Sequence, residues 1–119
     1  GLDILDNGKQ VAVVDSSIEA HMLDLLIYRE NAKLPQAGDH PYQIAGKSCL
    51  AGDIFGEARF AQPLKVGDRI SVQDAAGYTM VKKNWFNGVA MPAICIRETD
   101  GTITVQRTFG YDDYRASLS

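Results

Sequence analysis

The chain has 119 residues, of which 45% are hydrophobic and 23% charged, enough for a single domain with its own core. This composition excludes a disordered tail, a collagen-like repeat and a small scaffold that depends on disulfides. Twelve Lys and Arg against fifteen Asp and Glu give a formal net charge of −3, so no basic surface favours nucleic acid or an anionic membrane.

The beginning of the chain carries no recognisable targeting segment. No basic leader with an apolar run opens it, and no apolar stretch approaches the roughly 20 residues of a membrane span, so we expect a cytosolic location. The first residue is Gly1 and the first methionine is Met22. The sequence therefore indicates a trimmed chain or a piece of a longer polypeptide.

Short strand-like segments dominate the pattern. The expected strands are Gln10–Asp15, Tyr42–Ala45, Glu57–Phe60, Arg69–Gln73, Met91–Arg97 and Thr102–Arg107. Ile18–Tyr28 is the only stretch with the apolar spacing of a full helix, and Tyr111–Ala116 suits one helical turn. Close strand spacing, glycine-containing turns and the absence of a βα alternation predict an all-β fold, an antiparallel β-barrel or sandwich.

The two cysteines, Cys49 and Cys95, are expected to be free thiols. A disulfide between them is possible, but a pair of cysteines without a secretory signal is more often reduced. Together with His21 and His40 they match no zinc spacing, so no metal site is expected.

Three segments could carry chemistry. Cys49 lies on a glycine-bracketed loop, Gly46–Asp53, where it is either a partly exposed thiol or a small buried hydrophobe. Tyr78 follows small residues and either binds a ligand oxygen or lies in the core. Asn84–Gly88 is typical of a turn cushioned by aromatic side chains.

Two further side chains are given a structural interpretation. His21 stands on an otherwise apolar stretch, which favours a partly buried histidine with satisfied ring nitrogens over a catalyst. Cys95, between two isoleucines of a strand, is expected to pack. No phosphate-binding glycine loop, paired-carboxylate motif or nucleophile elbow is present.

Taken in order, the segments GKSCLAGDIFG, DAAGYTM and FNG resemble the C-terminal β-domain of the pyridoxal 5'-phosphate (PLP)-dependent decarboxylases with the alanine-racemase-type fold. That family acts on ornithine, arginine and diaminopimelate. The stretches VVDSSIEAHMLDLL, CLAGDIFGE and YTMVKKNWFNG are most similar to its carboxynorspermidine (carboxyspermidine) decarboxylases. The resemblance covers nearly the whole chain.

The resemblance implies that residues 1–119 form a Greek-key-like β-barrel or sandwich at the C-terminal end of a longer, homodimeric decarboxylase of polyamine biosynthesis. A preceding TIM-like barrel of the same polypeptide would bind PLP through a lysine, and the two subunits would share each active site. By itself the chain would be inactive, and we expect it to expose an apolar patch and to self-associate.

The resemblance also implies roles for individual residues. Cys49 matches a cysteine that crosses the dimer interface and protonates Cα of the substrate after CO₂ leaves. Tyr78 matches a tyrosine that binds the cofactor phosphate. Asp53 matches an acidic residue that pairs with a lysine of the other subunit or faces the substrate. Phe86 and Asn87 match residues that shape an interface loop near the site.

Leu50 departs from part of the family. In the ornithine and diaminopimelate enzymes the residue after the cysteine is acidic and lies near the distal end of the substrate, whereas Leu50 cannot pair with an ammonium group. A longer carboxylated triamine fits this change, with its far amine bound by Asp53, Glu19 or a group on the barrel. Two alternatives stay open: a related diamino-acid decarboxylase, or a free-standing all-β interaction module.

Overall fold

The computed structural model describes all 119 residues and contains a four-stranded sheet with the order β1-β2-β3-β4. Its strands are β1 (Leu2–Ile4), β2 (Gln10–Val13), β3 (His40–Ala45) and β4 (Ile54–Phe60). β1 pairs with β2 and β3 with β4 in antiparallel fashion, whereas β2 and β3 are parallel. Parallel neighbours need a crossover connection, and here the crossover is helical.

Two short helices form that crossover, α1 (Ile18–His21) and α2 (Leu23–Tyr28). Ser17 is the N-cap of α1, and its hydroxyl accepts a hydrogen bond from the Ala20 N–H at 3.3 Å. Met22 has a φ of −138°, which separates the two helices, and Arg29 ends α2 in the left-handed conformation. The single helix expected at Ile18–Tyr28 is therefore two helices with a break at Met22.

The core of this part of the molecule is a cluster between the sheet and the segments that cross it. Its seven buried members are Ala12, Ala32, Tyr42, Ile44, Phe55, Ala58 and Phe60. Tyr42 and Phe60 meet edge to face with ring centroids 5.8 Å apart, and the Tyr42 hydroxyl accepts a hydrogen bond from the Leu64 N–H. Burying a side chain such as Phe55 contributes about 1.5–3 kcal/mol.

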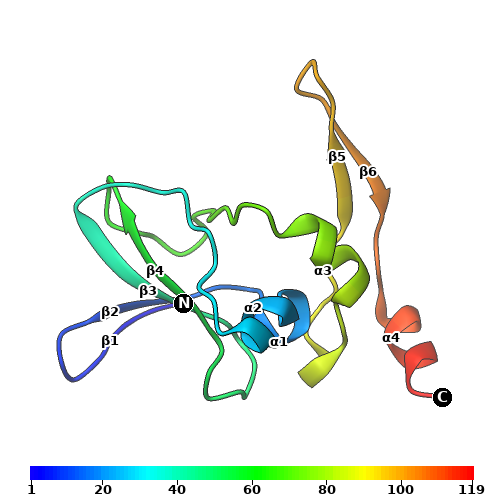
Figure 1. Ribbon diagram of the computed structural model, residues 1–119, viewed down its shortest axis with the longest axis horizontal. Coiled ribbons are helices and arrows are strands. Elements are labelled where there is room, and N and C mark those ends of the chain that lie inside the picture. Colours follow the sequence, from blue (N-terminus) through cyan, green and yellow to red (C-terminus); the bar gives the residue numbers. More distant parts are fainter.

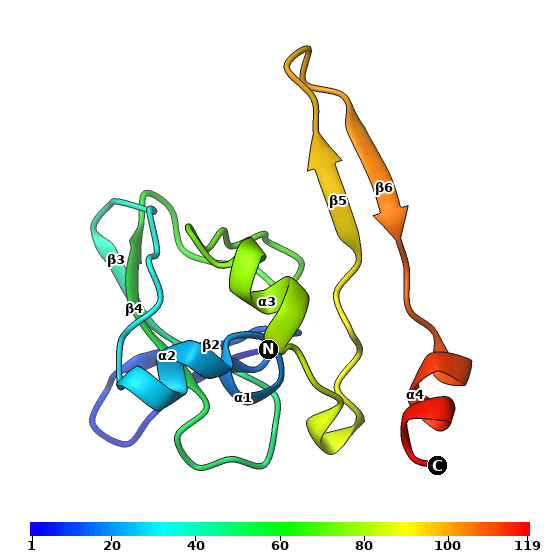
Figure 2. The same ribbon diagram turned by 45° about the vertical axis from the view of Figure 1, so that its right-hand side comes forward.

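The second part of the chain is more extended. It comprises α3 (Ala76–Lys82), the 3₁₀ turn η1 (Phe86–Gly88), β5 (Ile94–Arg97), β6 (Ile103–Arg107) and α4 (Tyr111–Ser117). β5 and β6 form an antiparallel hairpin that pairs with no other strand and stands away from the four-stranded sheet (Figures 1 and 2). No residue after Val89 is buried.

The expected all-β class is wrong in two respects. Helices are present between β2 and β3 and around the hairpin, and the β2–β3 pair is parallel, so the chain contains mixed structure and two open sheets rather than a closed antiparallel barrel. The strand expected at Arg69–Gln73 is also absent, because only Gln73 forms a bridge, to Lys33. The segment with Tyr78, for which the sequence predicts no helix or strand, is helical.

Other expectations are confirmed. Strands occupy the expected positions at β2, β3, β4, β5 and β6, although β4 begins three residues earlier than expected, and the tail forms α4. Both cysteines are free thiols. They are also exposed, so the interpretation of Cys95 as a packing residue is wrong. None of the helices is long and apolar enough to cross a membrane.

Candidate active site

Cys49 lies at the tip of the loop that connects β3 to β4, which we call the Cys49 loop (Gly46–Asp53). Its thiol is exposed, which rules out the buried interpretation in this chain. The loop closes on itself through hydrogen bonds from the Gly46 N–H to the Asp53 carbonyl at 2.8 Å and from the Asp53 N–H to the Leu50 carbonyl at 3.0 Å. Leu50 is half-buried beside the cysteine.

The Asp53 carboxylate organises the base of this loop. It is 4% exposed, and it accepts hydrogen bonds from the Ile18 N–H at 2.7 Å, the Ser48 N–H at 3.0 Å and the Ser48 hydroxyl. Burial alone would raise the pKa of Asp53, but these donors outweigh it and hold the pKa below its usual value. A Cβ at Gly46 would lie 2.1 Å from the carboxylate, so only glycine fits there.

The position of Asp53 does not support the role that the family resemblance implies for it. Its oxygens point into the chain and are occupied by donors from α1 and from the Cys49 loop itself. A carboxylate in this position binds neither a lysine of another subunit nor a substrate amine without first giving up those hydrogen bonds. Asp53 is better described as the residue that joins the loop to α1.

Asn87 touches the Cys49 loop from the other side. Its Oδ1 accepts a hydrogen bond from the Cys49 N–H at 2.8 Å, across 38 residues of sequence. Asn87 has a φ of 58°, a left-handed conformation that asparagine tolerates better than most residues. The neighbouring Phe86 is 38% exposed. The structure thus brings Cys49, Asp53 and Asn87 together, as the motif spacing alone does not show.

Tyr78 lies apart from this group, on α3. Its side chain is 58% exposed, so the core interpretation is wrong, and the Lys82 ammonium lies 4.7 Å from the centroid of its ring. The exposed Tyr78 side chain has a hydroxyl that can donate a hydrogen bond, and Lys82 adds a positive charge over its ring. α3 is tied to α1 by the Thr79 hydroxyl, which donates to the His21 carbonyl at 2.5 Å.

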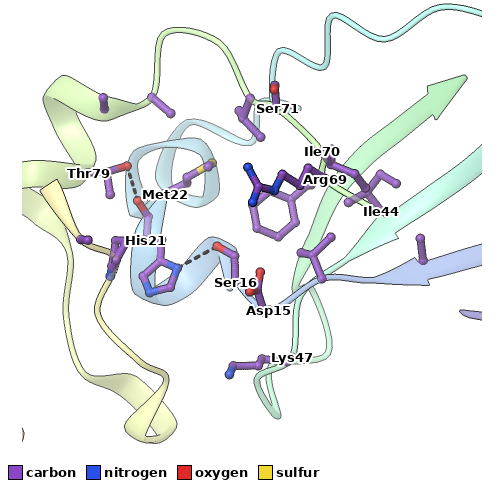
Figure 3. A pocket seen from close by; sticks show the side chains of 18 of the residues that line it. Asp15, Ser16, His21, Met22, Ile44, Lys47, Arg69, Ile70, Ser71 and Thr79 are labelled. Atoms are coloured by element: carbon purple, nitrogen blue, oxygen red, sulfur yellow. Dashed lines mark hydrogen bonds between the residues drawn. The ribbon is translucent and has the colours of Figure 1, made fainter. Parts of the chain in front are cut away.

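His21 is buried and structural, as expected. Its Nε2 lies 3.0 Å from the Ala90 carbonyl. Figure 3 shows its other bond, in which Nδ1 lies 2.7 Å from the Ser16 hydroxyl. Because a carbonyl only accepts, Nε2 carries the hydrogen, and in the neutral ring Nδ1 accepts from Ser16. Burial lowers the pKa of His21 below its usual value, which keeps the ring neutral near pH 7.

A cavity of about 1580 Å³ lies elsewhere, between the sheet, the segment 64–72, α3 and the start of β5. Its polar wall includes Ser16, His21, Lys47 and Arg69 (Figure 3). Neither Cys49 nor Tyr78 lines it, so cavity size does not point to the site that the motifs predict. No group of three His, Cys, Asp or Glu side chains is arranged to hold a metal ion.

Comparison with known proteins identifies the protein family to which the chain belongs. Residues 3–76 match the family described as "Pyridoxal-dependent decarboxylase, C-terminal sheet domain". The chain belongs to this family, and the resemblance seen in its motifs is confirmed.

Two individual relatives are similar over most of the chain. The chain is 71% identical over 119 residues to a carboxynorspermidine/carboxyspermidine decarboxylase of Herminiimonas arsenicoxydans, covering 99% of the chain and 33% of that protein. It is 50% identical over 113 residues to a carboxyaminopropylagmatine decarboxylase of Synechocystis, covering 90% of the chain and 29% of that protein.

A solved structure supports the same grouping. The crystal structure of carboxynorspermidine decarboxylase from Campylobacter jejuni, complexed with norspermidine, superposes with a TM-score of 0.86 at 33% identity. The match covers 98% of this chain and 36% of that one. The chain thus spans about a third of the length of the relatives that it matches.

Proposed function

We propose that the chain is the C-terminal domain of a PLP-dependent decarboxylase that converts carboxynorspermidine or carboxyspermidine to norspermidine or spermidine and CO₂. The observation that carries this proposal is the 71% identity over the whole chain to a relative of that name. The structural likeness to the Campylobacter jejuni enzyme supports it. In the longer polypeptide, we propose that the two open sheets become parts of one β-barrel, completed by strands outside residues 1–119.

The cofactor would lie mostly on a barrel domain of the same polypeptide, and this chain would contribute to its phosphate. Tyr78 supplies a hydroxyl donor, and Lys82, beside its ring, supplies a positive charge. When bound, PLP stabilises the electron pair that CO₂ leaves behind at Cα. Because Tyr78 is largely exposed in this chain, it is free to meet a group presented by another domain.

Cys49 is the residue that we expect to finish the reaction in a homodimer. Its exposed thiol stands at a loop tip, where a second subunit can approach it. The thiol donates its proton to Cα of the substrate, the C–H bond forms, and the resulting thiolate is reprotonated from solvent. Proton delivery to Cα, and to no other atom, gives the amine product.

Leu50 is the basis for choosing among substrates. It is half-buried next to Cys49 and carries no charge, so it cannot bind the distal ammonium group of ornithine or diaminopimelate. Asp53 is also an unsuitable anchor, because its oxygens are already hydrogen-bonded inside the chain. Glu19, which is half-buried on α1, and acidic groups on the barrel domain are the anchors that stay open.

The test is a comparison of CO₂ release by the full-length, PLP-loaded protein. The substrates are carboxynorspermidine, carboxyspermidine, carboxyaminopropylagmatine, ornithine and diaminopimelate at equal concentrations. We expect the two carboxylated triamines to react fastest and the Leu50→Asp variant to shift preference towards ornithine, by about tenfold or more for one ion pair in a desolvated site.

The other outcomes identify what is wrong. A preference for ornithine or diaminopimelate would keep the enzyme class and overturn the substrate. Faster release from carboxyaminopropylagmatine would place the protein with the Synechocystis relative. Absence of CO₂ from every substrate would favour a free-standing interaction module.

A further inference from the structure

The tip of the Cys49 loop has one hydrogen bond to a residue distant in the sequence. Cys49, Ala51 and Gly52 are exposed, and the Cys49 N–H donates to Asn87 Oδ1 at 2.8 Å. The other bonds at the tip are local, from the Leu50 N–H to the Ser48 hydroxyl and from the Ile54 N–H to the Gly52 carbonyl, and the remaining bonds of the loop lie nearer its base. The Asn87 side chain is therefore the contact that fixes where the Cys49 backbone, and with it the thiol, is placed.

Asn87 can fix this position because its own turn is well defined. The Gly88 N–H donates to the Trp85 carbonyl at 2.8 Å, and the Val89 N–H donates to the Phe86 carbonyl at 3.2 Å. Val89 is buried, and the Trp85 ring packs against Tyr114 of α4 at a centroid distance of 5.5 Å. η1 is thus held from both sides.

η1 is in turn attached to α1. Asn84 donates from Nδ2 to the Glu19 carbonyl at 3.0 Å and from its N–H to the Ala20 carbonyl at 2.9 Å. Its Oδ1 accepts from the Phe86 N–H at 2.9 Å, which ties the turn to the same side chain. Beyond the turn, His21 donates from Nε2 to the Ala90 carbonyl.

α1 is also attached to the base of the Cys49 loop, through the bond from the Ile18 N–H to Asp53. The contacts therefore form a closed circuit. It runs from the Cys49 loop through Asp53 to α1, through Asn84 to η1, and through Asn87 back to Cys49. A loop tip with a fixed base and a fixed partner has a single position, whereas a tip with a base alone can move.

We propose that Asn87 is a positioning residue for Cys49, and that its side-chain acceptor holds the thiol where it delivers a proton to Cα. This inference rests on the proposed function. If the tip moves, protonation away from Cα would compete, and hydrolysis by water would then release an aldehyde in place of the polyamine. The molar ratio of polyamine to CO₂ then falls below one.

Two substitutions separate the acceptor from the backbone. Asn87→Gly keeps a residue that adopts a φ of 58° without strain and removes only the side chain. Asn87→Asp keeps an oxygen acceptor of the same reach on a residue that also tolerates this conformation. Both are made in the full-length, PLP-loaded enzyme, with Cys49→Ala as the reference for complete loss of the thiol.

Two readouts are measured. One is the ratio of polyamine to CO₂. The other needs no turnover: it is the rate at which iodoacetamide alkylates Cys49, followed by mass spectrometry of the peptide that contains it. For Asn87→Gly we expect alkylation of Cys49 to be about fivefold faster, as for loss of one hydrogen bond, and the product ratio to fall towards that of Cys49→Ala. Asn87→Asp should recover most of both.

Unchanged alkylation and product ratio in Asn87→Gly would overturn the proposal, and so would equal losses in both variants, since Asp retains the acceptor. A normal product ratio in Cys49→Ala would instead refute the proposed role of the thiol, while the alkylation rates would still test the hydrogen bond. If Asn87→Gly does not fold, amide hydrogen exchange of the unmodified enzyme tests the hydrogen bond instead. We expect the Cys49 amide to be protected from exchange. Exchange of this amide at the rate of an open loop would contradict the proposal.

Discussion

The four-stranded sheet and the β5–β6 hairpin are both built from short strands with β-branched residues, but they differ in what covers them. In the sheet, Ile44 and Phe55 are 1% exposed. In the hairpin, Ile96, Ile103 and Val105 are 47%, 66% and 57% exposed. A two-stranded ribbon with no covered face is only marginally stable in water. The sheet therefore makes its own core, and we expect the hairpin to be stable only where other protein surface covers it.

This difference bears on the site. The Cys49 loop connects β3 and β4, which together contribute five of the seven residues of the core cluster, so the base of the loop is anchored in the core. The exposed apolar residues of the hairpin agree with the apolar patch expected of the isolated chain. Self-association through that patch stays a prediction.

The largest expected effect is the loss of stability when a residue is removed from the core of the four-stranded sheet. Phe55→Ala should lower the free energy of unfolding by about 3–5 kcal/mol, because it empties a fully buried site, whereas Val105→Ala should change it by less than about 0.5 kcal/mol. Urea denaturation of the 119-residue chain, at concentrations where sedimentation shows a monomer, measures both. Similar losses of unfolding free energy in the two variants would show that Val105 is buried in a core of the hairpin, and would contradict the difference described here.

A smaller effect is expected at Asp53. Asp53→Asn keeps the shape but loses the charge that strengthens the bonds from Ile18 and Ser48, which should cost about 1.5–3 kcal/mol at neutral pH. Since the folded pKa of Asp53 lies below its usual value of 3.8, the carboxylate stabilises the fold above that pH, and the contribution is lost as the pH falls through the folded pKa. The unfolding free energy of Asp53→Asn should therefore fall less steeply below pH 4 than that of the unmodified chain, and parallel curves would refute this.

Sequence patterns predicted the parts of the fold that depend on local composition. Strands rich in valine and isoleucine, such as β2 and β6, were predictable for this reason. α3 was not, because Ala75, Ala76 and Gly77 give no apolar period. The parallel pairing of β2 with β3 follows from the path of α1 and α2, which no strand pattern contains.

The candidate site likewise contains residues that sequence motifs single out and contacts that they do not predict. The motifs single out Cys49 and Tyr78 as candidates, because they lie in short segments with characteristic neighbours, and their roles stay predictions. The role of Asp53 could not be predicted in this way, because its partner Ile18 is 35 residues away. The bond from Cys49 to Asn87 and the two bonds of Asn84 to α1 are likewise long-range, and a single sequence carries no signal for them.

The central claim is that Cys49 delivers the proton that completes decarboxylation. The most direct measurement compares Cys49→Ala with Cys95→Ala, the other exposed cysteine, in the full-length, PLP-loaded enzyme acting on carboxynorspermidine. We expect Cys49→Ala to lose about 10²–10⁴-fold in polyamine formation, the usual contribution of a general acid, while Cys95→Ala retains the activity of the unmodified enzyme. Before substrate is added, cofactor absorbance should be the same in both variants. Full polyamine formation by Cys49→Ala, with one polyamine for each CO₂, would contradict the claim.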